Sequence, residues 1–178
     1  MLATVTSNGA HDFDFLHGSW TFHLRKLRDT TDPDCTEWVE SEGTSEAFPV
    51  LDGLGNIDRL FMPAAGGAEA FEGFTLRLYD PGTDTWRIWW SSTRAPGVFD
   101  EPVVGRFDDG RGTFECDDVV GGQPVRVRYS WFADAAEPRF EQAFSRDGGD
   151  TWATNWITTQ RRRGEGASWP DAQVQPRR

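Results

Sequence analysis

The sequence predicts an all-β protein, a single up-and-down antiparallel β-barrel of about ten strands. In the longest stretches without glycine or proline, apolar side chains alternate with polar ones, as at Val125, Val127, Tyr129 and Trp131. A period of two is typical of half-buried strands. Short segments rich in Gly, Asp and Pro separate these stretches, and such segments form tight turns.

The alternating stretches and turns place the strands near residues 18–29, 36–47, 56–63, 70–79, 85–93, 103–107, 112–118, 125–133, 139–146 and 152–162. Because the connections are short, sequence neighbours are expected to pair antiparallel. An open meander of this length leaves two unpaired edges, which closure into a barrel removes. A β-sandwich is the structural alternative. A closed barrel has an interior that can hold one small ligand.

The chain has 178 residues, and we expect one barrel domain over residues 11–163 followed by a polar, mobile tail over 164–178. Its 18 basic and 29 acidic residues give a net charge of −11, which argues against nucleic acid and anionic membranes as partners. No apolar run approaches the roughly 20 residues of a membrane-spanning helix. A homodimer is left open.

The N-terminal residues do not resemble a secretory signal, since they carry neither a basic start nor a long apolar block. The two cysteines, Cys35 and Cys116, lie far apart in no metal-binding spacing. Both features predict a cytoplasmic protein with reduced thiols.

The first predicted strand carries a family resemblance. Residues 13–20 are Phe-Asp-Phe-Leu-His-Gly-Ser-Trp, a short apolar lead-in followed by Gly-x-Trp. This resembles the Gly-x-Trp motif of the lipocalins and the wider calycin superfamily. Together with Gly-Leu-Gly-Asn at 53–56 and the segment 140–156, it resembles an uncharacterised bacterial lipocalin-like family.

The resemblance implies a lipocalin-like barrel in which the lead-in closes one end. It also implies that Trp20 packs at that end, under an arginine from the last strand. Arg161, Arg162 and Arg163 end that strand and are the candidates. A cation over an indole contributes roughly 0.5–2 kcal/mol. The resemblance implies a fold and a pocket but no reaction.

A second motif spans residues 145–152, which fit the Ser-x-Asp-x-Gly-x-Thr-Trp pattern of the sialidase Asp-box. In those enzymes the box is a hairpin turn that lies away from the chemistry. A chain of this length cannot supply the several blades of a sialidase propeller. The motif therefore predicts a stabilised hairpin and not a sialidase.

The candidate binding residues are aromatic side chains expected on inward faces, with a few polar side chains among them. They are Phe22, Trp38, Phe74, Trp90, Arg94, Tyr129, Trp131, Gln142, Phe144 and Trp156. Arg94 follows a Trp-rich strand and is expected at the mouth of the barrel. For each aromatic residue the alternative is that it only fills the core.

These features predict a protein that binds a small, mostly apolar ligand in an aromatic-lined barrel. No Gly-x-Ser-x-Gly, His-Glu-x-x-His or phosphate-binding glycine loop is present, and we expect neither cofactor nor metal. The alternative is a cofactor-free cyclase or isomerase that folds a polyketide- or terpene-like substrate in the same barrel.

Such an enzyme needs an acid or base at the reacting atom, and the candidates are Glu141 and His23. Glu141 lies within a strand between Phe140 and Phe144, and His23 is the histidine inside a predicted strand. Simple alternation turns both side chains outward, so only a β-bulge would bring either of them into the lumen.

Overall fold

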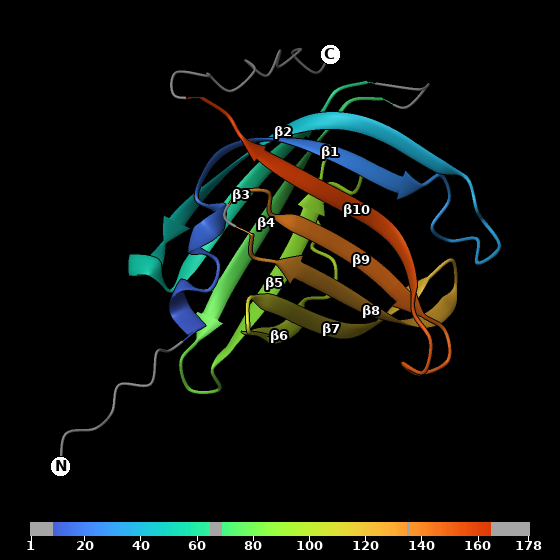
Figure 1. Ribbon diagram of the computed structural model, residues 1–178. Coiled ribbons are helices and arrows are strands. Elements are labelled where there is room, and N and C mark those ends of the chain that lie inside the picture. The colour runs from blue at the N-terminus through green and yellow to red at the C-terminus, as the bar shows by residue number, and fades with distance from the viewer. Residues whose placement is uncertain (1–8, 65–68, 135, 165–178) are drawn as a thin grey trace.

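The computed structural model describes residues 9–64, 69–134 and 136–164, and it confirms the closed antiparallel barrel (Figure 1). Its strands are β1 (Gly18–Leu27), β2 (Trp38–Val50), β3 (Gly55–Met62), β4 (Phe71–Asp80), β5 (Thr85–Ser92), β6 (Val103–Asp108), β7 (Arg111–Val120), β8 (Gln123–Phe132), β9 (Arg139–Ser145) and β10 (Ala153–Arg162). Each strand pairs antiparallel with its sequence neighbours, and β1 also pairs with β10. This closure excludes the sandwich alternative.

Two-residue turns of the expected composition set the register of neighbouring strands. Asp109 and Gly110 join β6 to β7 with φ values of 45° and 75°, and Gly121 and Gly122 join β7 to β8 with 59° and 77°. Positive φ at both central residues matches the right-handed twist of a hairpin.

The predicted hairpin at residues 145–152 is also present, between β9 and β10. Asp147 accepts hydrogen bonds from the Ser145 hydroxyl at 2.7 Å and from the Thr151 backbone N–H at 2.9 Å. The Trp152 indole donates to the Gly149 carbonyl and lies under Arg128, whose Cζ is 3.6 Å from the ring centroid. The Asp-box residues therefore stabilise a turn at the end of the barrel.

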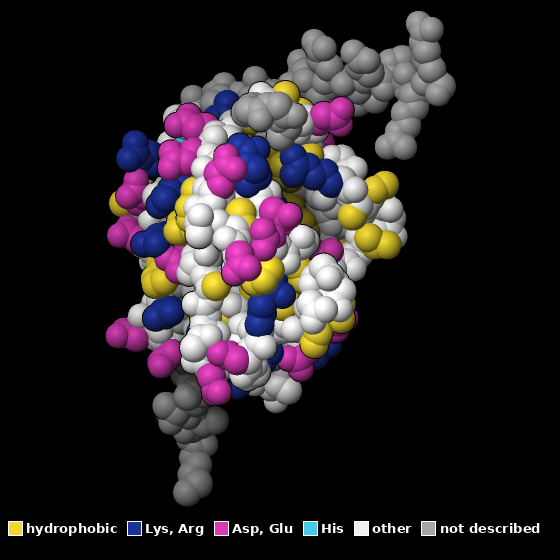
Figure 2. All heavy atoms as spheres, turned by 90° about the vertical axis from the view of Figure 1, so that its right-hand side faces the viewer, with side chains coloured by type: hydrophobic (Ala, Val, Ile, Leu, Met, Phe, Trp, Pro, Cys, Tyr) yellow, Lys and Arg dark blue, Asp and Glu magenta, His cyan; other side chains and the backbone are white. Residues whose placement is uncertain are grey.

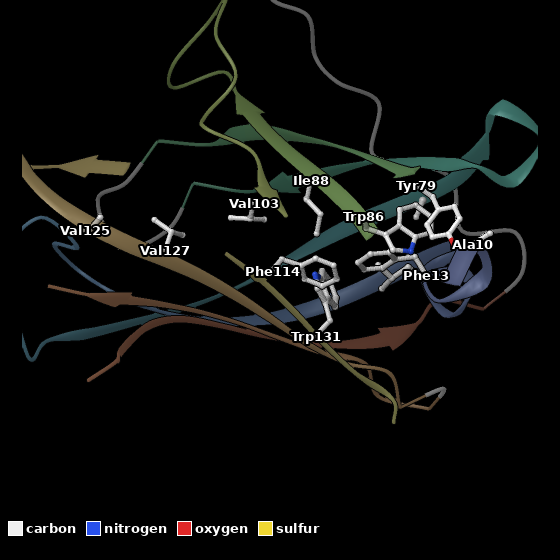
Figure 3. Close-up of a cluster of buried hydrophobic side chains, with 12 residues drawn as sticks. Ala10, Phe13, Tyr79, Trp86, Ile88, Val103, Phe114, Val125, Val127 and Trp131 are labelled. Carbon is white, nitrogen blue, oxygen red and sulfur yellow. The ribbon is translucent and has the colours of Figure 1, made fainter. Parts of the chain in front are cut away.

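The lead-in closes the other end of the barrel by inserting an aromatic ring. Two short 3-10 turns, Gly9–His11 and Asp14–Leu16, place Phe13 inside the barrel, where it is 0% exposed. Its ring centroid lies 5.1 Å from that of Trp86, 4.9 Å from that of Phe107 and 5.5 Å from that of Phe114. In Figure 3 this cluster lies at one end of a row of apolar side chains that continues to Val127 and Val125.

Trp20 and an arginine of the last strand form the contact that the resemblance implied. Arg162 Cζ lies 4.3 Å from the centroid of the Trp20 ring. Its guanidinium donates to the carbonyls of His17, at 3.0 Å, and Phe15, at 3.3 Å. The Trp20 indole donates to the Leu16 carbonyl at 2.7 Å. These bonds tie the lead-in to β1 and β10.

Within the residues described, no helix is both long and apolar enough to cross a membrane. Apart from Gly164, the tail predicted over residues 164–178 lies outside the described residues.

Candidate functional site: a cavity in the barrel lumen

We call Phe13 and the rings around it, Trp86, Phe107 and Phe114, the aromatic plug. Beyond it, the lumen contains a cavity of about 300 Å³. That volume is at the lower end of the range for small-molecule sites. Its lining extends to Asp118 and Val120, at the end of β7 that lies opposite the plug. That end of the barrel lies at the right of Figure 1 and faces the viewer in Figure 2. There, acidic and basic side chains surround apolar ones.

Most of the cavity wall is apolar and aromatic. The apolar wall consists of Phe22, Leu60, Ile88, Trp90, Val103, Val127, Tyr129, Trp131, Phe140, Phe144 and Trp156. The rings of Trp90 and Trp156 meet edge to face at a centroid distance of 6.3 Å, and those of Tyr129 and Phe140 at 5.1 Å. Aromatic contacts of this kind hold the rings in place, so the wall is largely preformed.

Many of the predicted binding residues lie in this wall. The structure places Phe22, Trp90, Tyr129, Trp131, Gln142, Phe144 and Trp156 around the cavity. At a β-bulge between Thr154 and Trp156, Asn155 has no partner residue on β9, and Trp156 pairs with Gln142. The Gln142 amide donates to Asn155 Oδ1 at 2.8 Å, so the bulged residue anchors a polar group of the wall.

The other predicted binding residues lie elsewhere. Trp38 is on the outer face of β2, with Arg25 Cζ 5.1 Å from its ring centroid. Phe74 is 36% exposed on the outer face of β4, next to Phe99. Arg94 does not line the cavity, and its Cζ lies 3.9 Å from the centroid of the Phe71 ring.

Neither candidate acid or base lies on the lumen. His23 Nε2 is 3.4 Å from Glu40 Oε2 on the outer face of β1 and β2. Glu141 forms an ion pair with Arg139, and its neighbours Phe140 and Gln142 are the residues that line the cavity. The only register shift between β9 and β10 is at Thr154 and Trp156, so both residues keep the outward facing that alternation gives.

Sequence reasoning missed a polar group at the inner end of the cavity. We call this group the polar floor, and it consists of Ser45, Asp58, Thr75, Arg77, Thr158 and Gln160. Arg77 is 3% exposed and donates to Asp58 Oδ2 at 2.6 Å and to Asn56 Oδ1 at 2.9 Å. Its Cζ lies 5.1 Å from the Phe13 ring centroid, so the floor rests on the aromatic plug.

The polar floor was missed because part of β3 and β4 turns charged side chains toward the lumen and apolar side chains outward. Asp58 and Arg77 face the lumen, while Ile57 and Leu76, which are paired with each other, face outward. The β4–β5 hairpin could have predicted this facing, because it pairs Tyr79 with Trp86, whose side chain points inward. Arg77, two residues before Tyr79, must then face inward as well.

Three carboxylates lie near the open end of the cavity. We call Asp100, Glu101 and Asp118 the acidic mouth. Partial burial and, second, the charge of Asp118 raise the pKa of Asp100 above its ordinary value. Burial, followed by the charges of neighbouring carboxylates, raises the pKa of the Cys116 thiol to about 12. Cys116 therefore stays a protonated, weakly nucleophilic thiol at neutral pH.

A single lysine lies across the mouth from these acids. Lys26 Nζ is 4.4 Å from the centroid of the Trp156 ring. Burial and, second, the charge of Arg94 lower the pKa of Lys26. Burial also raises the pKa of Tyr129 far above its ordinary value, so the phenol in the wall stays neutral. The charged groups are thus confined to the mouth and to one paired set at the floor.

The fold and cavity define a class of protein: a closed antiparallel barrel with one plugged end and an internal chamber, consistent with lipocalin- and calycin-like barrels. Among the described side chains, no group of His, Cys, Asp and Glu is arranged to hold a metal. The chain matches no model of a known protein family and no curated protein.

Proposed function

We propose that the protein binds a small, mostly apolar molecule inside the barrel. The observation that carries the proposal is the cavity of about 300 Å³, walled by aromatic side chains and closed at one end by Phe13 and Trp86. Moving apolar surface from water into such a site gains roughly 25 cal/mol per Å². Because the rings of the wall are already in place, little of this free energy is lost in ordering them when the ligand binds.

Glycines beneath the wall support this proposal, because they give the rings of the wall room beside the strands. A Cβ atom at Gly73 would lie 2.1 Å from Trp90 Cη2, and one at Gly43 would lie 2.5 Å from Phe22 Cζ. At these two positions the aromatic rings lie against bare backbone. A larger residue would push the rings into the lumen.

A fluorescence titration with the uncharged probe N-phenyl-1-naphthylamine tests the proposal. We expect the probe to brighten, to quench the indoles of Trp90 and Trp156, and to raise the melting temperature. At 100 times its dissociation constant a ligand adds about 2.7 kcal/mol of stability. Absence of both signals would overturn the proposal.

A cofactor-free cyclase or isomerase working on an apolar substrate in the same lumen is the second candidate. Asp100 and Lys26 favour it, because both line the cavity and both have a pKa displaced toward neutrality. In place of Glu141 and His23, these groups would act as acid and base. The test is conversion of polyketide- and terpene-like substrates, followed by mass spectrometry. Asp100→Asn should lower turnover roughly 10²–10⁴-fold while probe binding persists.

We also infer a reducing compartment, and specifically the cytoplasm. Cys35 and Cys116 are both free cysteines, as is usual for proteins kept under reducing conditions. Membership of a bacterial lipocalin-like family stays a prediction that rests on residues 13–20, 53–56 and 140–156. A homodimer also stays a prediction, and analytical ultracentrifugation would measure it.

A further inference from the structure

The polar floor contains buried hydrogen-bonding groups that the barrel itself does not satisfy. The side chains of Ser45, Thr75, Thr158 and Gln160 are each less than a tenth exposed. All of them line the cavity, and within the described ranges the Gln160 amide oxygen is buried without a hydrogen-bond partner. A buried polar group without a partner is costly, so such groups are normally paired. The unpaired Gln160 oxygen, together with three hydroxyl groups that line the same cavity, indicates a site for a polar partner.

The charges of the floor restrict what that partner can be. Arg77 Nη1 lies 2.6 Å from Asp58 Oδ2, so the two charges neutralise each other, and the same nitrogen donates to Asn56 Oδ1. Arg77 Nε is buried without a hydrogen-bond partner in the described part of the chain, and a neutral acceptor can pair with it. A carboxylate placed there would meet Asp58, and an ammonium group would meet Arg77. Anions must also pass the three carboxylates of the acidic mouth, Asp100, Glu101 and Asp118, which repel them. The floor is therefore complementary to an uncharged group.

We propose that the ligand carries a neutral hydroxyl group at its inner end, which hydrogen-bonds to the polar floor while its apolar body lies along the apolar wall. A hydroxyl can donate to the Gln160 amide oxygen and accept from the Thr158 or Ser45 hydroxyl. The ligand class is thus a hydroxylated hydrophobe, such as a phenol or a cyclic alcohol. This inference rests on the proposed function, since it names the substrate or ligand class of the same cavity.

Competition against N-phenyl-1-naphthylamine with three molecules of one shape tests this inference at pH 7. The three competitors are naphthalene, 2-naphthol and 2-naphthoate. A wholly apolar pocket prefers naphthalene, because naphthol would lose its bonds to water without replacement. We expect the opposite, with 2-naphthol binding about tenfold more tightly than naphthalene, the effect of one good buried hydrogen bond. We expect 2-naphthoate to be the weakest of the three.

Two variants assign the preference to the floor. Gln160→Leu and the near-isosteric Thr158→Val should each reduce the preference for 2-naphthol over naphthalene to less than about threefold. Thr159→Val changes the next residue of β10, which the alternation of β10 places on the outer face, and should leave the preference unchanged. Because Thr158→Val keeps the side-chain volume, it tests the floor even if the larger change at Gln160 disturbs folding.

The outcomes separate this inference from the proposed function. If naphthalene binds as tightly as 2-naphthol, the lumen is a binding site but the hydroxyl inference is overturned. The same conclusion follows if the preference survives both floor variants. If none of the three molecules displaces the probe and the probe itself does not bind, the proposed function fails as well.

Discussion

The two ends of the barrel are built from the same alternating strands but are filled differently. At the closed end Trp86 is 1% exposed and packs against Phe13. Four residues further along β5, Trp90 faces the same lumen but is only half-buried and borders the cavity. The difference comes from the lead-in, because Phe13 and Leu16 pack among the side chains at one end, whereas the connections at the other end border the cavity without filling it.

Aromatic side chains on a lumen face therefore have two uses. Where a segment outside the barrel inserts a ring among them, they form a packed core that stabilises the fold. Where nothing inserts, they form a wall that leaves room for a ligand. Mutations at the two ends should therefore separate stability from binding.

The free energy of unfolding should fall most when an aromatic side chain is removed from the closed end. Trp86→Ala or Trp20→Ala should cost about 3–5 kcal/mol, because each leaves a large cavity in a packed region. Trp90→Ala should cost only about 1–2 kcal/mol, since the side chain is half-buried and already borders empty space. Denaturant titration measures both.

The same Trp90→Ala variant should weaken binding of N-phenyl-1-naphthylamine, because the indole forms part of the apolar wall. Equal losses of stability at Trp86 and Trp90, with unchanged probe binding by Trp90→Ala, would contradict the division into a core end and a binding end.

A smaller effect is expected from the arginine that covers Trp20. Arg162→Ala should destabilise the barrel by about 0.5–2 kcal/mol because the contact between its guanidinium and the Trp20 indole is lost. Loss of its hydrogen bonds to the lead-in carbonyls should add to this destabilisation. Arg161→Ala is the matched control, since its side chain is exposed and pairs with Glu137 on the outside. Exposed pairs contribute at most about 1 kcal/mol. An equal or larger loss in the control would show that Arg162 does not tie the lead-in.

The smallest effects are expected in the pH dependence of stability, with opposite signs at the two ends. At the closed end, hydrogen bonds from the Tyr79 hydroxyl and the Gly9 N–H lower the pKa of Asp84. At the mouth, burial and the charge of Asp118 raise the pKa of Asp100. Asp84 therefore stabilises the fold above its ordinary pKa of 3.8, and this contribution is lost as the pH falls through the lowered folded value.

Asp100 behaves in the opposite way, since the folded state holds its proton more tightly than the unfolded state. Stability decreases as the pH rises from the ordinary value of 3.8 through the raised folded value. At pH 7, Asp84→Asn should lower the melting temperature and Asp100→Asn should raise it, and both differences should shrink toward pH 3. Changes of the same sign in the two variants would contradict the electrostatic contrast.

The sequence predicted the barrel because Val125, Val127 and Tyr129 alternate strictly with polar residues, and the observed β8 has that facing. The family resemblance, in turn, gave the Trp20–arginine contact. Neither source predicted the polar floor, because Arg77 and Asp58 form an ion pair between neighbouring strands, and single-strand periodicity carries no information about pairing. Phe74 was expected in the lumen because it is aromatic, although its strand turns it outward.

If the lumen is a binding chamber, a side chain that fills it should block binding of the probe. Thr158 lines the cavity, whereas Thr159, the next residue of β10, alternates to the outer face. A phenylalanine at position 158 should occupy the empty space at little cost in stability, since the cavity accommodates the added ring.

The measurement is the dissociation constant of N-phenyl-1-naphthylamine for the Thr158→Phe and Thr159→Phe variants, beside the unaltered protein. We predict that Thr158→Phe weakens binding by at least about tenfold, a loss of about 1.4 kcal/mol, while keeping the melting temperature of the fold. We predict that Thr159→Phe binds the probe like the unaltered protein. Equal binding by both variants would contradict the claim, because the probe would then be bound outside the lumen.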